Sequence, residues 1–174
     1  NERIVVLDAD VCSSTQTKLF KARFPGRFFT FGIAEANMVS AAAGFAASGC
    51  IPVVSTFALF IALRAGDQVR AQVAYAGANV KLVGGYSGLS DYKDGPTHFA
   101  TNDVALMRAM PNMVVLAPAD NTEAALLVPV IAEHEGPVYM RISRAAVPDV
   151  FDSGHTVRIG QGATVRAGGD VTIV

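Results

Sequence analysis

The chain has 174 residues, of which 51% are hydrophobic and 17% are charged. That length suits one domain with a sizeable buried core, and the composition is too apolar for intrinsic disorder. No stretch reaches the roughly 20 uncharged apolar residues that a membrane-spanning helix needs. Fourteen Lys and Arg against fifteen Asp and Glu give a net charge of -1 without a basic cluster. We therefore expect neither a nucleic-acid partner nor a membrane partner.

The two cysteines, Cys12 and Cys50, are spaced neither like a disulfide framework nor like a zinc site. We expect buried or partly buried thiols. Because no charged-then-apolar signal peptide opens the sequence, the expected location is the reducing cytoplasm. Glycines gather in residues 160–169, which indicates a linker, and residues 171–174 have the composition of a strand. The expected organisation is one domain over residues 1–158, then a linker and the first strand of a truncated further domain over residues 159–174.

Short apolar runs alternate along the chain with longer segments of helical period. The runs predict strands over residues 4–7, 28–31, 51–55, 80–84, 113–117 and 138–141. Apolar residues that recur every three or four positions predict helices over residues 34–47, 59–75, 104–110 and 122–133. This alternation is typical of an α/β domain, doubly wound, with a mainly parallel sheet and helices on both faces.

The start of the last predicted helix has a capping signal. Asp120 can accept hydrogen bonds from the free amides of the first turn, and Glu123 follows three residues later, the spacing of a capping box. The helix should therefore begin immediately after Asp120.

Ligands of open parallel sheets bind beyond the carboxyl ends of the strands, so the residues that follow each strand are the first candidates for a site. The candidates in chain order are Asp8, Asp10, Ser13 and Ser14 after the first strand, Glu35 after the second, Phe57 and Phe60 after the third, and Tyr86 with residues 94–98 after the fourth.

Each candidate also has a purely structural interpretation. Glu35 opens a predicted helix, where the helix dipole stabilises an acid whatever its function. Phe57 and Phe60 stand three apart, a spacing usual for aromatic residues of a core. Residues 94–98 (DGPTH) form a tight turn that holds a carboxylate and an imidazole close together, either as a structural turn or as a site. Arg64 is most simply part of a solvated helix face.

Taken together, the segments match a known order. They are DVCSST (10–15), FGIAEANM (31–38), STFALF (55–60), RAGDQ (64–68), DGPTH (94–98), MRAMPNM (107–113), PAD (118–120) and GPVYMRISR (136–144). This series closely resembles the central, pyrimidine-binding domain of the transketolase family, and it is most similar to the C-terminal subunit of a split transketolase. The resemblance runs from Ile4 to about Arg144.

The resemblance implies a thiamine-diphosphate enzyme that transfers a two-carbon ketol unit between sugar phosphates. In that family this domain holds the aminopyrimidine ring, while a separate domain holds magnesium and the diphosphate. Glu35 would hydrogen-bond the ring nitrogen and favour the imino tautomer, which removes the proton from the thiazolium carbon. A carboxylate in a dry pocket shares a proton readily because burial disfavours its lone charge. Phe57 and Phe60 would form the aromatic wall against which the pyrimidine stacks.

The remaining roles also come from the resemblance. Asp10 corresponds to a residue near the cofactor, and Ser14 and Arg144 correspond to residues that take the sugar phosphate. Asp94 and His98 correspond to residues that contact the sugar hydroxyls, which makes Glu35 and His98 the expected catalytic pair. Planar guanidinium suits phosphate because it donates two charged hydrogen bonds at once.

The sequence departs from the family pattern near the sugar. Transketolases commonly have a His at the substrate-binding position of Tyr86, a Gly-Glu pair in place of Tyr92 and Lys93, and a Gln in place of Phe99. Since these positions border the sugar, we expect a donor or acceptor other than the usual pentose phosphates, with Lys93 favouring an additional anionic group.

The family's Gly-Asp-Gly magnesium signature with its following Asn is absent from the sequence. No metal site is therefore expected on this chain, and its expected partners are a diphosphate-binding domain or subunit and further copies of itself. Three alternatives remain open: a deoxyxylulose-phosphate synthase domain, a 2-oxo-acid dehydrogenase beta-subunit domain, and a non-catalytic oligomerisation or regulatory module.

Overall fold

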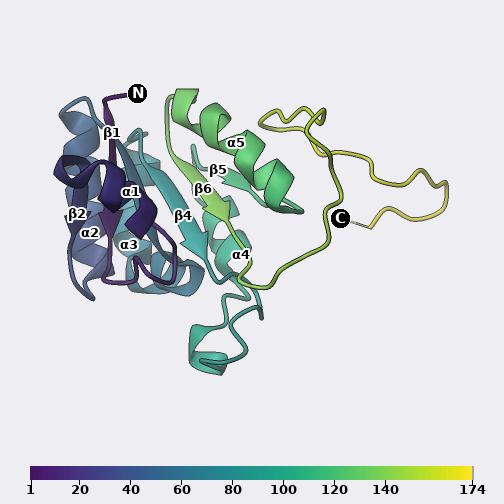
Figure 1. Ribbon diagram of the computed structural model, residues 1–174, viewed down its shortest axis with the longest axis horizontal. Coiled ribbons are helices and arrows are strands. Elements are labelled where there is room, and N and C mark those ends of the chain that lie inside the picture. The colour runs from purple at the N-terminus through teal and green to yellow at the C-terminus, as the bar shows by residue number, and fades with distance from the viewer. Residues whose placement is uncertain (174) are drawn as a thin grey trace.

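A single parallel sheet of six strands forms the centre of the protein in a computed structural model that describes residues 1–173 (Figure 1). The strands are β1 (Ile4–Asp8), β2 (Phe28–Thr30), β3 (Ile51–Phe57), β4 (Lys81–Gly85), β5 (Val114–Leu116) and β6 (Val138–Arg141). Their order across the sheet is β2-β1-β3-β4-β6-β5, and all five pairings are parallel. The predicted α/β fold with a mainly parallel sheet is confirmed.

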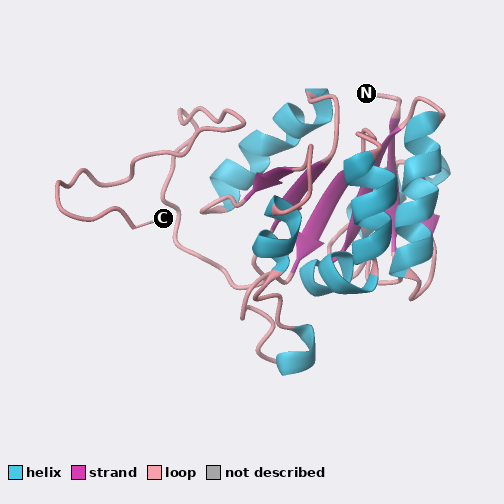
Figure 2. Cartoon of the chain, turned by 180° about the vertical axis from the view of Figure 1, so that it is seen from behind, coloured by secondary structure: helices cyan, strands magenta, loops and turns pink. Residues whose placement is uncertain are grey.

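Helices cover both faces of the sheet. One face, toward the viewer in Figure 1, carries α1 (Lys18–Arg23) and α5 (Asn121–Glu133). The opposite face, toward the viewer in Figure 2, carries α2 (Glu35–Ala47), η2 (Phe60–Arg64), α3 (Gly66–Gln68), η3 (Val69–Tyr75) and α4 (Asp103–Arg108). Short 3-10 turns are η1 (Pro25–Arg27) and η4 (Pro96–His98). This division between the faces is the one that right-handed crossovers require for the observed strand order.

The chain changes direction across the sheet between β1 and β3. From β1 it crosses to β2 on one side, and it then passes back over β1 to form β3 on the other. Loops that leave two neighbouring strands in opposite directions open a crevice at their carboxyl ends, where ligands of doubly wound sheets bind. The topology therefore locates the site at the edge where β1, β3 and β4 end.

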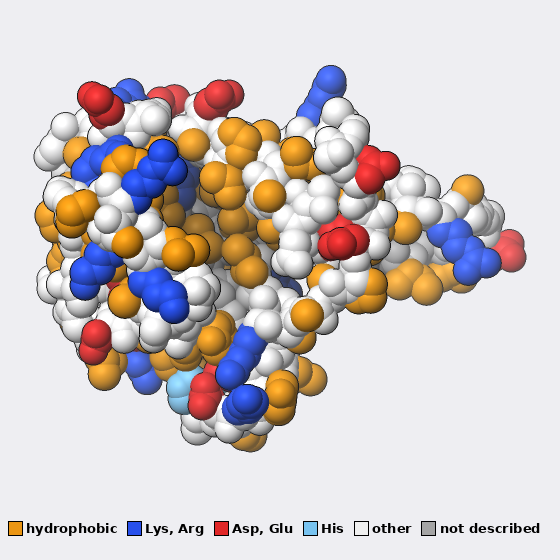
Figure 3. Space-filling view, viewed as in Figure 1, with side chains coloured by type: hydrophobic (Ala, Val, Ile, Leu, Met, Phe, Trp, Pro, Cys, Tyr) orange, Lys and Arg blue, Asp and Glu red, His pale blue; other side chains and the backbone are white. Residues whose placement is uncertain are grey.

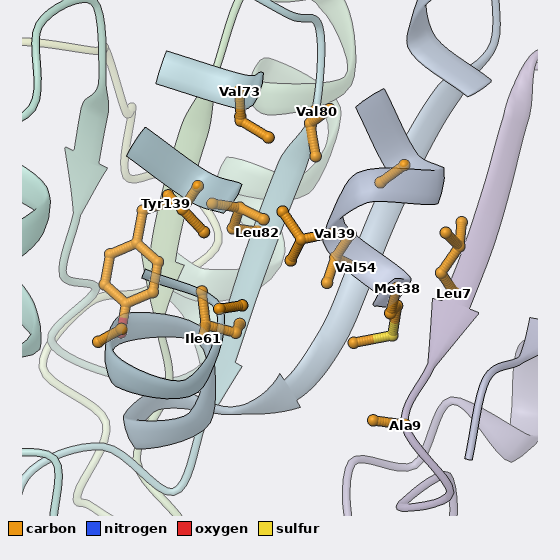
Figure 4. Packing of buried hydrophobic residues seen from close by; sticks show 14 of the residues in the cluster. Leu7, Ala9, Met38, Val39, Val54, Ile61, Val73, Val80, Leu82 and Tyr139 are labelled. Carbon is orange, nitrogen blue, oxygen red and sulfur yellow. The ribbon is translucent and has the colours of Figure 1, made fainter. Parts of the chain in front are cut away.

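The main core lies between the sheet and the face that carries α2. Its centre contains Leu7, Val54 and Leu82 from the strands and Met38 and Ile61 from the helices, all with no exposed surface (Figure 4). A smaller cluster under α5 consists of Leu127, Ile131, Val138 and Met140. Strands buried on both faces explain why the strand sequences read as continuous apolar runs.

Residues 59–75, predicted to be helical, are helical except at Ala65, but they do not form one continuous α-helix. The structure has two π-helical segments, η2 and η3. The turn residue Ala65 and the short α3 lie between them. The amide of Ala65 donates to the carbonyl of Phe60, five residues back, at 3.0 Å. Small residues at the break allow close packing on α2, and π-helical turns of this kind are frequent at functional sites.

Helix α1 was not predicted, because it is six residues long and buries none of them. The capping prediction for α5 is confirmed: the amide of Glu123 donates to Asp120 Oδ1 at 2.8 Å. The carboxylate of Glu123 accepts from the amide of Ala119 at 2.7 Å, one residue before the cap.

Beyond β6 the chain leaves the body of the protein as an irregular segment (Figures 1 and 2). Asp120 Oδ2 anchors its start by accepting from the amides of Val150 and Phe151 at 2.7 and 2.8 Å. Residues 171–173 form no strand, and Val174, the last residue of the predicted strand, lies outside the described residues. Within residues 1–173, no helix is both long and apolar enough to cross a membrane.

Candidate active site

A cleft of about 320 Å³ opens at the carboxyl edge of the sheet. The residues around it come from the ends of four strands: Ser14, Thr15, Gln16, Ser55, Val83, Gly85, Tyr86, Ile142, Ser143 and Arg144. Its lining is rich in hydroxyl groups and includes one cationic side chain, that of Arg144, among the residues that the structure describes. Hydroxyls and a guanidinium suit a polyhydroxylated, anionic ligand.

The loop that follows β1 is held in place by Asp8, which is fully buried. Its Oδ1 accepts from the amide of Val11 at 2.9 Å, and its Oδ2 accepts from the hydroxyl of Thr17 at 3.0 Å. Burial raises the pKa of Asp8 above its ordinary value, although these hydrogen bonds oppose the shift. Asp8 thereby fixes the loop that brings Ser14 to the cleft.

Glu35 is the first residue of α2 and is buried, with its side chain 5% exposed. Its Oε1 accepts from Arg64 Nη1 at 3.2 Å. Arg64 ends η2 and is half exposed, so it is not simply part of a solvated helix face as predicted. A buried carboxylate requires such a charged partner or a hydrogen-bond donor in its place.

Four rings lie close together beside this ion pair. Phe57 stacks on Tyr86 with centroids 4.2 Å apart and on Phe60 at 5.5 Å. The ring of His98 meets the edges of Phe57 and Phe60 at 6.0 and 5.3 Å. The imidazole Nδ1 of His98 lies 3.0 Å from the hydroxyl of Thr97, which fixes the ring orientation. The DGPTH turn therefore positions His98 against the rings of Phe57 and Phe60.

Arg64 connects the acid to the rings. Its Cζ lies 3.7 Å from the centroid of the Phe60 ring, so one side chain both neutralises Glu35 and covers an aromatic face. Phe57 and Phe60 are each only 7% exposed. The guanidinium therefore occupies a position that adjoins both the Phe60 ring and the Glu35 carboxylate.

Arg144 is paired with two acids at the far side of the cleft. Its Nη1 donates to Oδ1 of Asp91, which is fully buried, and lies 3.8 Å from Asp94 Oδ2. Its Cζ lies 4.8 Å from the centroid of Tyr86. The hydrogen bond with Asp91 is the main cause that raises the pKa of Arg144. The guanidinium is therefore fixed in position and permanently charged.

The backbone of Arg144 is held by the same loop. Its amide donates to Ser90 Oγ at 3.1 Å, and that hydroxyl donates to the carbonyl of Ser87 at 2.6 Å. The loop between β4 and the DGPTH turn thus binds Arg144 at both its backbone and its side chain.

The structure brings most of the predicted site residues together. Glu35, Phe57, Phe60, Tyr86, His98, Asp94, Arg144 and Ser14 all lie along this edge of the sheet. Asp10 is exposed and adopts a left-handed backbone with φ 66°, outside the lining of the cleft. Sequence reasoning missed the pairing of Arg64 with Glu35 and the pairing of Asp91 with Arg144. The RAGDQ motif contained a signal for Arg64, whereas no motif pointed to Asp91.

The comparison with protein families agrees with this geometry. The family model described as "Transketolase, pyrimidine binding domain" matches residues 1–150. The chain belongs to the transketolase family. A transketolase C-terminal section from Methanocaldococcus jannaschii is 43% identical over 175 residues, which are 99% of this chain and 55% of that protein.

Two further transketolases are similar over nearly the whole chain. The 6-deoxy-6-sulfo-D-fructose transketolase subunit SqwH of Clostridium sp. (strain MSTE9) is 41% identical over 100% of this chain and 54% of its own length. The solved structure of a split gene transketolase, described as an inactive beta4 tetramer, has a TM-score of 0.85 and 43% identity over 97% of this chain and 54% of that one. The chain spans about half the length of these relatives. The part that matches the family model is the pyrimidine-binding domain.

The transketolase family implies thiamine diphosphate and a divalent metal. Glu35 fits an aminopyrimidine, because it is a buried acid that adjoins aromatic rings at the carboxyl edge of the sheet. Among the described residues there is no group of three or more His, Cys, Asp or Glu side chains that could hold a metal ion. On the face seen in Figure 3, basic and acidic side chains are both spread over the surface.

Proposed function

We propose that this transketolase-family chain supplies the pyrimidine-binding half of an enzyme that transfers a two-carbon ketol unit between anionic sugars. The observation that carries the proposal is Glu35, a buried acid at the start of α2 that shares Arg64 with the aromatic wall. When bound, thiamine diphosphate supplies a carbanion that is stabilised while it carries the two-carbon unit.

In this proposal Glu35 holds a proton at the aminopyrimidine nitrogen. Glu35 is buried, and a buried carboxylate shares a proton strongly with a nearby base. Arg64 neutralises Glu35 and moves off the Phe60 ring when the pyrimidine binds. Phe57 and Phe60 then provide the stacking surface, an interaction of about 1–3 kcal/mol for base-like rings. His98, which contacts both rings, is placed to act at the reacting carbon.

The sugar is proposed to lie in the cleft. Arg144 and Ser14 line it and would take the terminal anion, while Asp94 and His98 would take the sugar hydroxyls. Tyr86 forms the floor between the aromatic wall and Arg144, because it stacks on the first and underlies the second. Asp10, which is exposed at the same edge, would meet the cofactor only from the side of a partner.

The proposed partner is a subunit or domain that holds magnesium and the diphosphate, because the described residues offer no acid cluster for the cation. Self-association is also proposed, since α2 carries small residues at 41–44 that permit close helix approach. Cys12 and Cys50 are unpaired, which suits a reducing cytoplasm.

Reconstitution tests this function. The chain within its complete subunit should turn over a ketose phosphate only when the diphosphate-binding subunit, thiamine diphosphate and magnesium are all present. Each subunit alone serves as the control. Absence of turnover with any phosphorylated or sulfonated ketose, in a complex shown to form, would favour the non-catalytic alternative.

Calorimetry on the isolated chain tests where the diphosphate is held. We expect weak binding or none, because the contacts for magnesium and diphosphate are assigned to the partner. Submicromolar, magnesium-dependent binding to this chain alone would contradict that assignment.

A further inference from the structure

Recognition of the sugar's terminal anion depends on Arg144, the one cation that lines the cleft among residues 1–173. Its side chain is 28% exposed, and the hydroxyls of Ser14 and Ser143 line the same cleft. A guanidinium that meets an anion with no other positive charge nearby determines how much negative charge the site tolerates.

That positive charge is already balanced by Asp91. Asp91 has no exposed surface, and its Oδ1 accepts from Arg144 Nη1. Its other oxygen, Oδ2, is buried and has no hydrogen-bond partner within the part of the chain that the structure describes. A buried carboxylate keeps most of its electrostatic effect because solvent does not screen it. The pair therefore presents hydrogen-bond donors to the cleft with a net charge near zero.

The other charged side chains of this loop, Lys93 and Asp94, change the net charge that the cleft presents only a little. Lys93 is exposed, as is the neighbouring Tyr92, and neither lines the cleft. Asp94 is 47% exposed and lies 3.8 Å from Arg144, so solvent weakens its effect, which in any case adds negative charge. Of the two acids in this loop that pair with Arg144, Asp91 is the fully buried one, whereas Asp94 is partly exposed.

We propose that Asp91 is a specificity-determining residue that offsets the charge of Arg144, so that the cleft favours a sugar with a singly charged end group over one with a doubly charged phosphate. The inference rests on the proposed function and names the substrate class of the same site. Asp91 does not touch the substrate; it acts through Arg144. A phosphate monoester carries close to two charges at pH 7, whereas a sulfonate carries one at all accessible pH values.

Substitution of Asp91 by Asn separates charge from position. The amide oxygen of Asn can still accept from Arg144 Nη1, so the guanidinium stays in place, but the compensating negative charge is lost. The assay uses the complete subunit with its diphosphate-binding partner, and compares a ketohexose 6-phosphate with the matching 6-deoxy-6-sulfonate as donors. We expect the wild type to have the higher kcat/KM for the sulfonate. Asp91→Asn should raise the phosphate-to-sulfonate ratio of kcat/KM by about tenfold, mainly through KM.

The matched control is Asp67→Asn, which removes one exposed acid paired with Arg70 on the surface. It should leave the ratio unchanged. An unchanged ratio in Asp91→Asn, with both sugars turned over, would overturn this inference alone. Failure of the wild-type complex to turn over either sugar would overturn the proposed function and the inference with it.

The pH dependence of the wild type gives a second measurement that needs no variant. Phosphate monoesters lose their second proton near pH 6, while sulfonates do not titrate there. The phosphate-to-sulfonate ratio of kcat/KM should therefore fall as the pH rises from 5.5 to 7.5. A ratio that stays flat or rises over this range would contradict the inference even if Asp91→Asn failed to fold.

Discussion

Lys81 offers a test of the packing at the end of the sheet opposite the site. It is the first residue of β4 and is 1% exposed. Its Nζ donates to the carbonyls of His134 and Gly136 at 2.6 and 2.8 Å. Burial lowers the pKa of Lys81 from 10.5 to about 8, partly opposed by the charge of Glu135. A buried ammonium with two neutral partners should weaken the folded state when it is protonated.

The sign of the effect follows from the two pKa values. Between pH 8 and 10.5 the unfolded chain binds a proton at Lys81 more often than the folded chain does, so stability rises with pH in that window. Below pH 8 both states are protonated and the full destabilisation is present. The shift corresponds to roughly 3 kcal/mol, and the two carbonyls that accept from the ammonium reduce the expected effect to about 1–2 kcal/mol.

Urea unfolding of the wild type and Lys81→Met at pH 7.5, 9 and 10.5 measures this effect. The free energy of unfolding of the wild type should rise by about 1–2 kcal/mol relative to the variant across the series, since the titration of Tyr and Cys groups cancels in the difference. Lys93→Met removes an exposed ammonium and should give a flat difference. A flat or falling difference for Lys81→Met would refute the reasoning.

Three other perturbations test separate contacts. Gly84→Ala places a Cβ 2.9 Å from the Cα of Ala58, so the free energy of unfolding measured in urea should fall by about 2 kcal/mol or more. An unchanged unfolding midpoint would show that the backbone moves to make room for the Cβ. Arg64→Ala uncovers the Phe60 ring, and calorimetry on the reconstituted complex should show thiamine diphosphate binding several-fold tighter; weaker binding would mean that Arg64 holds the cofactor. Asp120→Ala should speed proteolysis after β6. Hydrogen bonds lower the pKa of Asp120 below 3.8, so in the wild type the segment after β6 should become sensitive to proteolysis only as the pH falls through that lower pKa. Sensitivity that appears already near neutral pH would contradict this.

Local pattern was sufficient for most of the fold. Buried strands such as β3 read as β-branched runs because both faces are covered, and Asp120 with Glu123 marks the start of α5. The break at Ala65 could not be predicted, since a local change from i→i+4 to i→i+5 hydrogen bonds has no residue motif of its own and depends on how the segment packs. Helix α1 escaped prediction because it has no buried face to produce a periodic pattern.

The candidate site was predictable where position along a strand decided it. Glu35 follows β2 and Phe57 ends β3, and because the carboxyl ends of parallel strands meet at one edge, topology brings both residues to that edge. The pairings of Arg64 with Glu35 and of Asp91 with Arg144 join residues 29 and 53 positions apart. Such pairings depend on how elements pack and not on local pattern. For the same reason sequence analysis singled out the exposed Lys93 in the loop that differs from the family pattern, and it overlooked the buried Asp91 in the same loop.

The most direct test of the central claim measures proton removal from the cofactor. The complete subunit is combined with its diphosphate-binding partner, thiamine diphosphate and magnesium, and exchange of the thiazolium carbon-bound proton for deuterium is followed by magnetic resonance. Glu35→Gln should retain the fold and much of the cofactor binding, yet slow the exchange by at least a hundredfold, because the amide cannot share the proton. An exchange rate equal to that of the wild type would show that Glu35 is only a helix-start acid paired with Arg64.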